Sequence, residues 1–305
     1  MDGFSLAFGE ITLVLFTTLA PSGALAYLIM GLPVLVGRAQ GEAARRLNQW
    51  SCLPLVIAMA GLIASATHLG NPSNALYVFT GVGRSPLSTE VFAAVIFLAL
   101  AGVFWLYSFA EHPRVGLQRG LLAAIDVAIV AFVLSVAFAY NVDTIVTWSL
   151  PLVPASLVLN ALFGGPLLAL VGFAAAGFDP GRRGACTLLA LATAACAANI
   201  AVYASLGFQL QGIENELVSA ADLVAGYPAY LAAFALLAVA ALALAWRAEA
   251  QSARRGLMEG QNAEAQDAHR RLLARLATAS ILAFAALFLM RFTFYMSHLT
   301  LGLGV

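Results

Sequence analysis

Eight long apolar segments dominate this chain of 305 residues, and short polar connectors separate them. Each segment reaches about 20 residues, the length at which an α-helix crosses the hydrocarbon core of a bilayer. Only 10% of the residues are charged, against about 25% in a soluble domain, so the chain cannot cover a water-facing surface. The sequence predicts an all-α integral membrane protein, an eight-transmembrane-helix bundle. The expected spans are residues 9–36, 48–67, 89–109, 119–140, 153–176, 185–208, 225–247 and 272–297.

The basic residues lie almost entirely on one side of this predicted bundle. All fifteen are Arg, the other side holds only Arg84, and Arg291 falls inside the last span. Since basic connectors stay on the cytoplasmic side of a membrane, both termini are predicted on the outer (periplasmic or extracellular) side. The thirteen inner residues are Arg38, Arg45, Arg46, Arg114, Arg119, Arg182, Arg183, Arg247, Arg254, Arg255, Arg270, Arg271 and Arg275.

Residues 1–305 are predicted to form a single transmembrane anchor domain. Its longest inner connector is a polar segment at 248–271, which lacks a sustained apolar face and is expected to be a solvated helix or a loop. The net charge is zero, which offers no basic surface to nucleic acid. The three Cys lack the short spacing of a zinc or iron–sulfur site, so no metal site is predicted.

Polar chemistry gathers on the predicted outer side. One long connector begins with His68 and ends with Glu90, which opens the third span, and Glu10 opens the first. A carboxylate also suits a helix N-terminus, so a purely structural role stays open for both Glu residues. Asp126 lies deeper, in the fourth span, and is expected to be a buried hydrogen-bonding residue.

Arg291 is the basic residue inside a predicted span. It lies about 10 Å below the outer end of the last span, at 1.5 Å per residue, and Tyr295 and His298 share its helix face. Snorkelling towards the headgroups is one explanation. The other is a polar stripe that lines an outer pocket, with Glu10 as the counter-ion of Arg291.

Several blocks of the sequence resemble the membrane anchor subunit of bacterial dimethyl sulfoxide reductase. They are ASATHLGNPSNALYVFTGVGRSPLSTE, GEITLVLFTTL, YNVDTIVTW, FGGPLLAL and FYMSHLTLG, and their order and spacing match along nearly the whole chain. The resemblance implies a multi-pass, eight-helix anchor of the bacterial cytoplasmic membrane, with both termini outside and no haem or iron–sulfur cluster of its own. Its expected partners are the lipid bilayer, a four-cluster ferredoxin-like iron–sulfur subunit and a molybdopterin catalytic subunit.

The resemblance also implies an activity, the oxidation of exchangeable menaquinol with transfer of electrons to the iron–sulfur subunit. It ties quinol binding to the His of the HLG motif and to the Glu that opens the next helix, here His68 and Glu90. Quinol oxidation releases two protons, and His accepts one near neutral pH, as does a carboxylate whose pKa is raised by burial. We therefore expect His68 and Glu90 to be catalytic. The full predicted quinol-binding set is Glu10, His68, Glu90, Tyr140, Arg291, Tyr295 and His298.

The electrons must leave through a partner that docks on the outer connectors. The residues expected to form this docking surface are Asn141, Asp143, Trp148, Glu214 and Glu216. Three alternatives stay open: a purely structural anchor, a transporter, and a haem-binding cytochrome b-type anchor. The last would need paired axial His, and only His68 and His298 lie on the outer side.

Overall fold

The computed structural model describes residues 2–68, 72–215, 218–255 and 263–300, and these contain eight helices long and apolar enough to cross a membrane. The eight predicted spans are confirmed. Six of them are α2 (Ile11–Leu35), α5 (Pro86–Tyr107), α6 (Val115–Ala139), α7 (Leu152–Ala175), α8 (Gly181–Leu210) and α10 (Tyr227–Arg255). The second span is divided at Ser51 into α3 (Gly41–Trp50) and α4 (Cys52–Ala66), and the last is α11 (Ala263–Met296).

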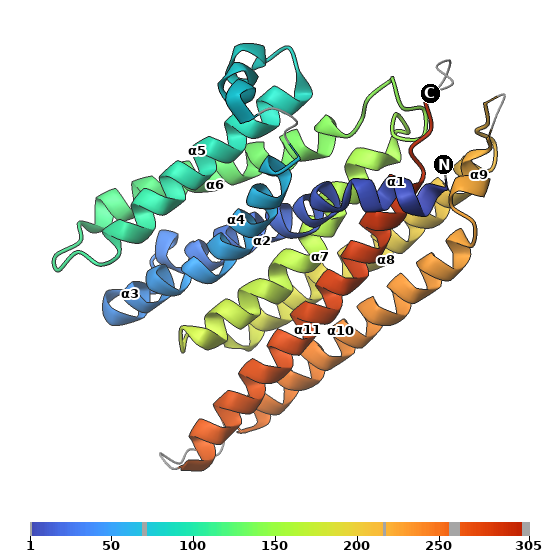
Figure 1. Cartoon of the computed structure of the whole chain (residues 1–305). Coiled ribbons are helices and arrows are strands. Elements are labelled where there is room, and N and C mark those ends of the chain that lie inside the picture. Colours follow the sequence, from blue (N-terminus) through green and yellow to red (C-terminus); the bar gives the residue numbers. More distant parts are fainter. Residues whose placement is uncertain (1, 69–71, 216–217, 256–262, 301–305) are drawn as a thin grey trace.

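Both termini lie at the same end of the bundle, as an even number of crossings requires (Figure 1). We call this end the terminal end. It carries the connectors between α4 and α5, between α6 and α7, and between α8 and α10. The opposite end, which we call the arginine end, carries the other connectors and their Arg residues. The sorting of Arg to one end therefore agrees with the sequence pattern.

Helices α2 and α7 form the centre of the bundle. Their most apolar windows are 72% and 83% buried inside the protein, whereas those of the other six spans are 28–44% buried and leave faces for lipid. Helix α2 contacts α4, α6, α7 and α11. Small residues allow the closest of these contacts: a Cβ on Gly61 of α4 would lie 2.9 Å from the backbone nitrogen of Ala20 on α2. Close backbone approach through small residues is the usual basis of helix packing in membranes.

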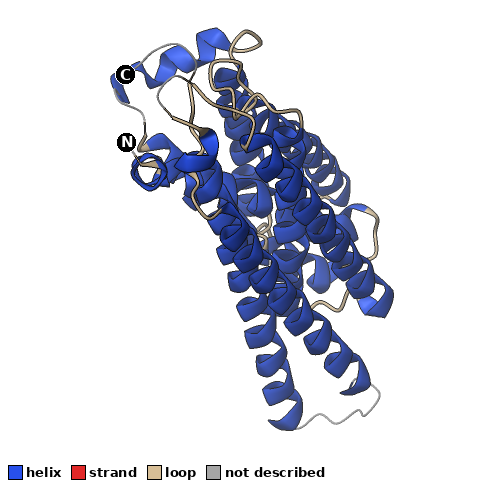
Figure 2. Ribbon diagram, turned by 90° about the vertical axis from the view of Figure 1, so that its right-hand side faces the viewer, coloured by secondary structure: helices blue, strands red, loops and turns tan. Residues whose placement is uncertain are grey.

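The last two spans are longer than expected. Helix α10 continues to Arg255, and α11 begins at Ala263, so most of the polar segment 248–271 is helical. Residues 256–262 lie outside the described residues. The two helices extend past the rest of the bundle at the arginine end (Figure 2). A polar sequence without an apolar face can form a helix where that helix leaves the bilayer. Of the two expectations for this segment, a solvated helix or a loop, the described residues show the helix.

Short elements cover the terminal end. Helix α1 (Gly3–Gly9) lies against α11, the 3₁₀ helix η1 (Pro72–Gly81) contacts α5, and α9 (Ala220–Leu223) contacts α1. The connector from α6 to α7 is fixed to the chain after α11, because the backbone nitrogen of Val146 donates to the oxygen of Leu299 at 3.1 Å. Thr147 Oγ1 also donates to the carbonyl of Ser297. These contacts hold the end of α11 against the start of α7.

Candidate functional site

The side chains of His68 and Glu10 face each other at the terminal end. His68 Nε2 lies 3.2 Å from Glu10 Oε2, and both side chains are partly exposed. Glu10 sits between α1 and α2, and His68 follows the end of α4. The close packing of α2 on α4 brings these two positions together. Glu10 is therefore the partner of His68, and the expectation that it would pair with Arg291 is wrong within the described residues.

Glu90 is buried in the first turns of α5. The helix begins where Ser85 accepts a hydrogen bond from the nitrogen of Ser88, with Pro86 at the first helical position, an arrangement that favours helix initiation. This places Glu90 about 6 Å inside the helix end, at 1.5 Å per residue. Its side chain is 2% exposed, and its Oε2 has no hydrogen-bond partner among the described residues. A buried carboxyl oxygen without a partner is unusual and marks a candidate binding position.

Arg291 is completely buried near the end of α11. Its Nε donates to Thr17 Oγ1 of α2 at 2.9 Å, while Nη1 and Nη2 have no hydrogen-bond partner among the described residues. The guanidinium carbon lies 4.1 Å from the ring centre of Phe294 and 5.3 Å from that of Tyr295. Snorkelling is therefore not what this side chain does. Cation–π contacts stabilise its charge inside the protein.

Aromatic side chains surround the guanidinium. Trp148 stacks on Phe294 at 4.8 Å and also contacts Tyr140, Tyr295 and His298, with ring centres 5.0–6.1 Å apart. Like Glu90, Arg291 and Tyr295 lie near a helix end, whereas Tyr140 and Trp148 lie in the connector between α6 and α7. We call Glu90, Tyr140, Trp148, Arg291 and Tyr295 the buried cluster.

Two pKa shifts reflect the surroundings of Tyr140 and His298 at the terminal end. Burial raises the pKa of Tyr140 well above its ordinary value, and the neighbouring Tyr295 and Glu90 raise it further. Burial lowers the pKa of His298, and the nearby carboxylate of Glu10 partly opposes this effect. Tyr140 is thus within electrostatic range of Glu90, as His298 is of Glu10. The predicted quinol-binding residues gather at one end of the bundle, although they come from five different parts of the sequence.

The predicted docking residues divide into two groups. Asp143 and Glu214 are exposed at the terminal end, whereas Asn141 is half-buried and donates to the carbonyl of Leu150 at 3.2 Å. Trp148 is 8% exposed and belongs to the buried cluster, so its ring faces inward and offers no docking surface. Glu216 lies outside the described residues.

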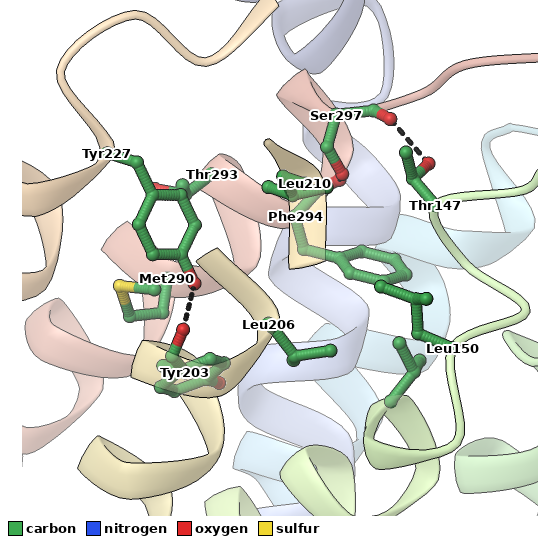
Figure 3. Close-up of a pocket in the computed structure, with 11 residues that line it drawn as sticks. Thr147, Leu150, Tyr203, Leu206, Leu210, Tyr227, Met290, Thr293, Phe294 and Ser297 are labelled. Carbon is green, nitrogen blue, oxygen red and sulfur yellow. Dashed lines mark hydrogen bonds between the residues drawn. The ribbon is translucent and has the colours of Figure 1, made fainter. Parts of the chain in front are cut away.

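A small pocket opens beside the buried cluster, between α7, α8, α10 and α11 (Figure 3). Phe294 separates the two, because it lines the pocket and also contacts the Arg291 guanidinium. Two dashed lines in the figure mark bonds that close the pocket wall: Tyr227 donates to the carbonyl of Tyr203, and Thr147 to that of Ser297. The pocket is lined by Thr147, Leu150, Val153, Tyr203, Leu206, Leu210, Tyr227, Met290, Thr293, Phe294 and Ser297.

Two parts of the polar interior were not predicted. Thr17 accepts the hydrogen bond that holds Arg291. The two residues are 274 positions apart, so this contact could be found only from the three-dimensional structure. Deeper in the bundle, Asn160 Oδ1 accepts hydrogen bonds from Asn199 at 2.6 Å and from Tyr203 at 2.9 Å. Both Asn stand out as polar residues within apolar runs, a signal that sequence analysis could have used. Within the described part of the protein, no group of three or more potential metal ligands occurs.

Comparison with known proteins gives a consistent family. Residues 5–258 match the family described as DMSO reductase anchor subunit (DmsC). The sequence is 30% identical to the C subunit of the anaerobic dimethyl sulfoxide reductase of Escherichia coli (strain K12) over 297 residues, or 97% of each protein. It is 29% identical to the C subunit of the same reductase from Haemophilus influenzae, over 72% of this protein and 77% of that one. The protein therefore belongs to the family of DMSO reductase anchor subunits and is a multi-pass membrane protein.

Proposed function

We propose that this protein anchors a DMSO reductase-type complex to the membrane, oxidises menaquinol at the terminal end, and passes the electrons to an iron–sulfur subunit docked there. The observation that carries the proposal is the position of Glu90. A buried carboxyl with an unpartnered oxygen lies within electrostatic range of Tyr140, at the same end of the bundle as the Glu10–His68 pair. Such a group is placed to take a proton from a ring hydroxyl that comes within hydrogen-bond reach.

In this mechanism, Glu90 and His68 are the proton acceptors. Menaquinol gives up two electrons and two protons, and one of these groups takes each proton. Glu10 holds the imidazole of His68 by the 3.2 Å contact, so the ring is oriented before quinol arrives. We assign Tyr140, Tyr295, Arg291 and His298 to the remaining sides of the proposed site. The buried aromatic rings exclude water, which strengthens every polar contact to the bound ring.

The acceptor of the electrons belongs to a partner. The protein belongs to the family of DMSO reductase anchor subunits. This membership supports an iron–sulfur subunit and a molybdopterin catalytic subunit as the other members of the complex. Exposed Asp143 and Glu214 give the terminal end an acidic rim, suited to a partner with basic residues. The concentration of Arg at the opposite end supports an outward-facing terminal end by the positive-inside rule.

The alternative of a haem between His68 and His298 fits these contacts less well. His68 is paired with Glu10, and the His298 ring lies 5.0 Å from that of Trp148. Both imidazoles are therefore engaged by neighbours within the same protein. A purely structural anchor would need only the docking surface and would leave the unpartnered polar atoms of the buried cluster without a purpose.

The experiment that tests this function measures the assembled complex in membranes with two electron donors. Glu90→Gln keeps the shape of the side chain and removes its basicity. We expect menaquinol-dependent substrate reduction to fall by about 100-fold, within the range of general acid–base catalysis, while a reduced dye that donates directly to the partner subunits supports full activity. Glu111→Gln, at an exposed position of the arginine end, is the matched control and should retain both activities. Full menaquinol-dependent turnover by Glu90→Gln would exclude the proposed role.

A further inference from the structure

We propose that Arg291 is a further catalytic residue, which binds a ring oxygen of menaquinol as an anion, so that the quinol reacts as its singly deprotonated form. This inference rests on the proposed function and adds to it the state of the substrate and the residue that stabilises that state. The positive charge of the Arg291 guanidinium has no carboxylate in contact with it among the described residues. An Arg guanidinium keeps its charge in proteins. Within the described residues, no carboxylate lies within ion-pair distance of the Arg291 guanidinium, although the side chain is completely buried.

The guanidinium is also incompletely hydrogen-bonded, because only its Nε has an acceptor. Thr17 accepts from Nε at 2.9 Å, which fixes the plane of the group. Nη1 and Nη2 have no acceptor among the described residues. A guanidinium presents its donors as a rigid fork that suits an oxygen anion. A buried charge with two unused donors is unfavourable, and a ligand oxygen with negative charge would supply both missing interactions at once.

Two neighbouring donors share this property. Trp148 Nε1 is buried and has no hydrogen-bond partner among the described residues. Tyr295 OH makes no hydrogen bond of regular geometry there, although the hydroxyls of Tyr140 and Thr17 and the Arg291 guanidinium lie near it. Their rings lie 5.4 Å apart, and the guanidinium carbon of Arg291 is 5.3 Å from the centre of the Tyr295 ring. Three side chains thus offer unused donors from one aromatic cluster. Fixed donors close to a bound oxygen stabilise the negative charge that develops on it.

The chemistry of quinol oxidation explains what such donors achieve. A phenolic hydroxyl ordinarily keeps its proton at neutral pH, and the neutral quinol is a poorer electron donor than its anion. Here the Glu90 carboxylate takes the first proton, and Arg291 stabilises the anion that remains. This anion then gives two electrons to the iron–sulfur clusters of the partner subunit and its second proton to His68, which leaves menaquinone. The protons and electrons balance without another reactant.

Other titratable groups also face this region, and they enter the expected pH dependence. They are Glu10 before α2, His68 after α4, Glu90 on α5, Tyr140 after α6, Tyr203 on α8, and Tyr295 and His298 on and after α11. Arg291 is the fixed positive charge among them. Its removal should therefore move the rising limb of the rate towards higher pH, since the quinol would then lose its proton less readily.

The test is the pH profile of menaquinol oxidation by the complete complex in membranes. For Arg291→Gln we expect kcat/KM at pH 7 to fall about tenfold, with the rising limb about one pH unit higher. Arg291→Lys keeps the charge and should keep the limb within a few tenths of a unit. Arg275→Gln, on the same helix at the arginine end, is the matched control. Dye-driven activity and the amount of membrane-bound complex report assembly separately.

The outcomes separate this inference from the proposed function. An unchanged pH profile and rate in Arg291→Gln would overturn the anion-binding role while leaving quinol oxidation intact. Absence of menaquinol oxidation by the wild-type complex would instead remove the proposed function itself. If the complex with Arg291→Gln does not assemble, Thr17→Val provides the test. This variant removes the hydrogen bond that holds the guanidinium and keeps the charge of Arg291. It should move the limb in the same direction by less, and an unmoved limb would overturn the inference.

Discussion

At the scale of single residues, the contact between Glu10 and His68 affects the orientation of the imidazole more than the stability of the protein. Both side chains are partly exposed, 34% and 43%, so water screens their attraction. An ion pair of this kind contributes at most about 1 kcal/mol to stability. Its larger effect is geometric, because it holds one ring nitrogen of His68 and so directs the imidazole beside the candidate quinol site.

We predict that Glu10→Gln leaves the protein folded and impairs quinol oxidation. The melting temperature in detergent should change little, since the lost interaction is about 1 kcal/mol or less. Menaquinol-dependent activity should fall several-fold, while dye-driven activity stays unchanged. Glu42→Gln is the control, because Glu42 forms an exposed ion pair with Arg46 at 3.9 Å, at the arginine end. A large loss of thermal stability, with activity unaffected, would contradict this separation.

Single residues also show where prediction from sequence stops. The depth of Glu90 and Arg291 follows from their distance along a helix, which is local information. The partner of Glu10 does not follow from local information, because only the packing of α4 on α2 brings His68 to it. The inward position of Trp148 depends likewise on contacts with α11, which are distant in sequence.

At the scale of elements, the spans were predictable because a run of apolar residues as long as the bilayer is thick allows one conformation. Their ends were less so. Helices α10 and α11 continue into polar sequence at the arginine end, where hydropathy no longer distinguishes a helix from a loop. The division between α3 and α4 at Ser51 was not predicted either. The expected span began at residue 48, which lies inside α3, so most of α3 was left outside it.

The contact between α2 and α4 positions the site, and Gly61 tests it. A Cβ at this position would lie 2.9 Å from the nitrogen and 3.0 Å from the Cβ of Ala20, so Gly61→Ala must move the helices apart. We expect a loss of about 1–3 kcal/mol, the usual effect of overpacking, seen as a lower melting temperature in detergent. Gly102→Ala on α5 meets no atom within 4 Å and should be neutral or slightly stabilising. Equal melting temperatures for the two variants would show that the helices adjust freely.

At the scale of the whole molecule, the two ends of the bundle have different chemistry. The arginine end holds solvated basic residues, whereas the terminal end holds the Glu10–His68 pair, the buried cluster and exposed acidic residues. Glu90 and Arg291 lie only about 6–8 Å inside their helix ends, at 1.5 Å per residue. Under the proposed function, a quinol ring bound there would lie close to a partner docked on the connectors, as electron transfer requires.

The proposed function depends on a quinol that binds at this end, with Glu90 as part of its site. The most direct measurement is a fluorescence titration of a quinol-analogue inhibitor into membranes that contain the complex, with the wild type beside Glu90→Gln and Glu111→Gln. We expect the inhibitor to bind tightly to the wild type and to Glu111→Gln. Binding to Glu90→Gln should be at least about tenfold weaker, a difference of about 1.4 kcal/mol in binding free energy. No binding by the wild type, or equal binding by all three, would contradict it.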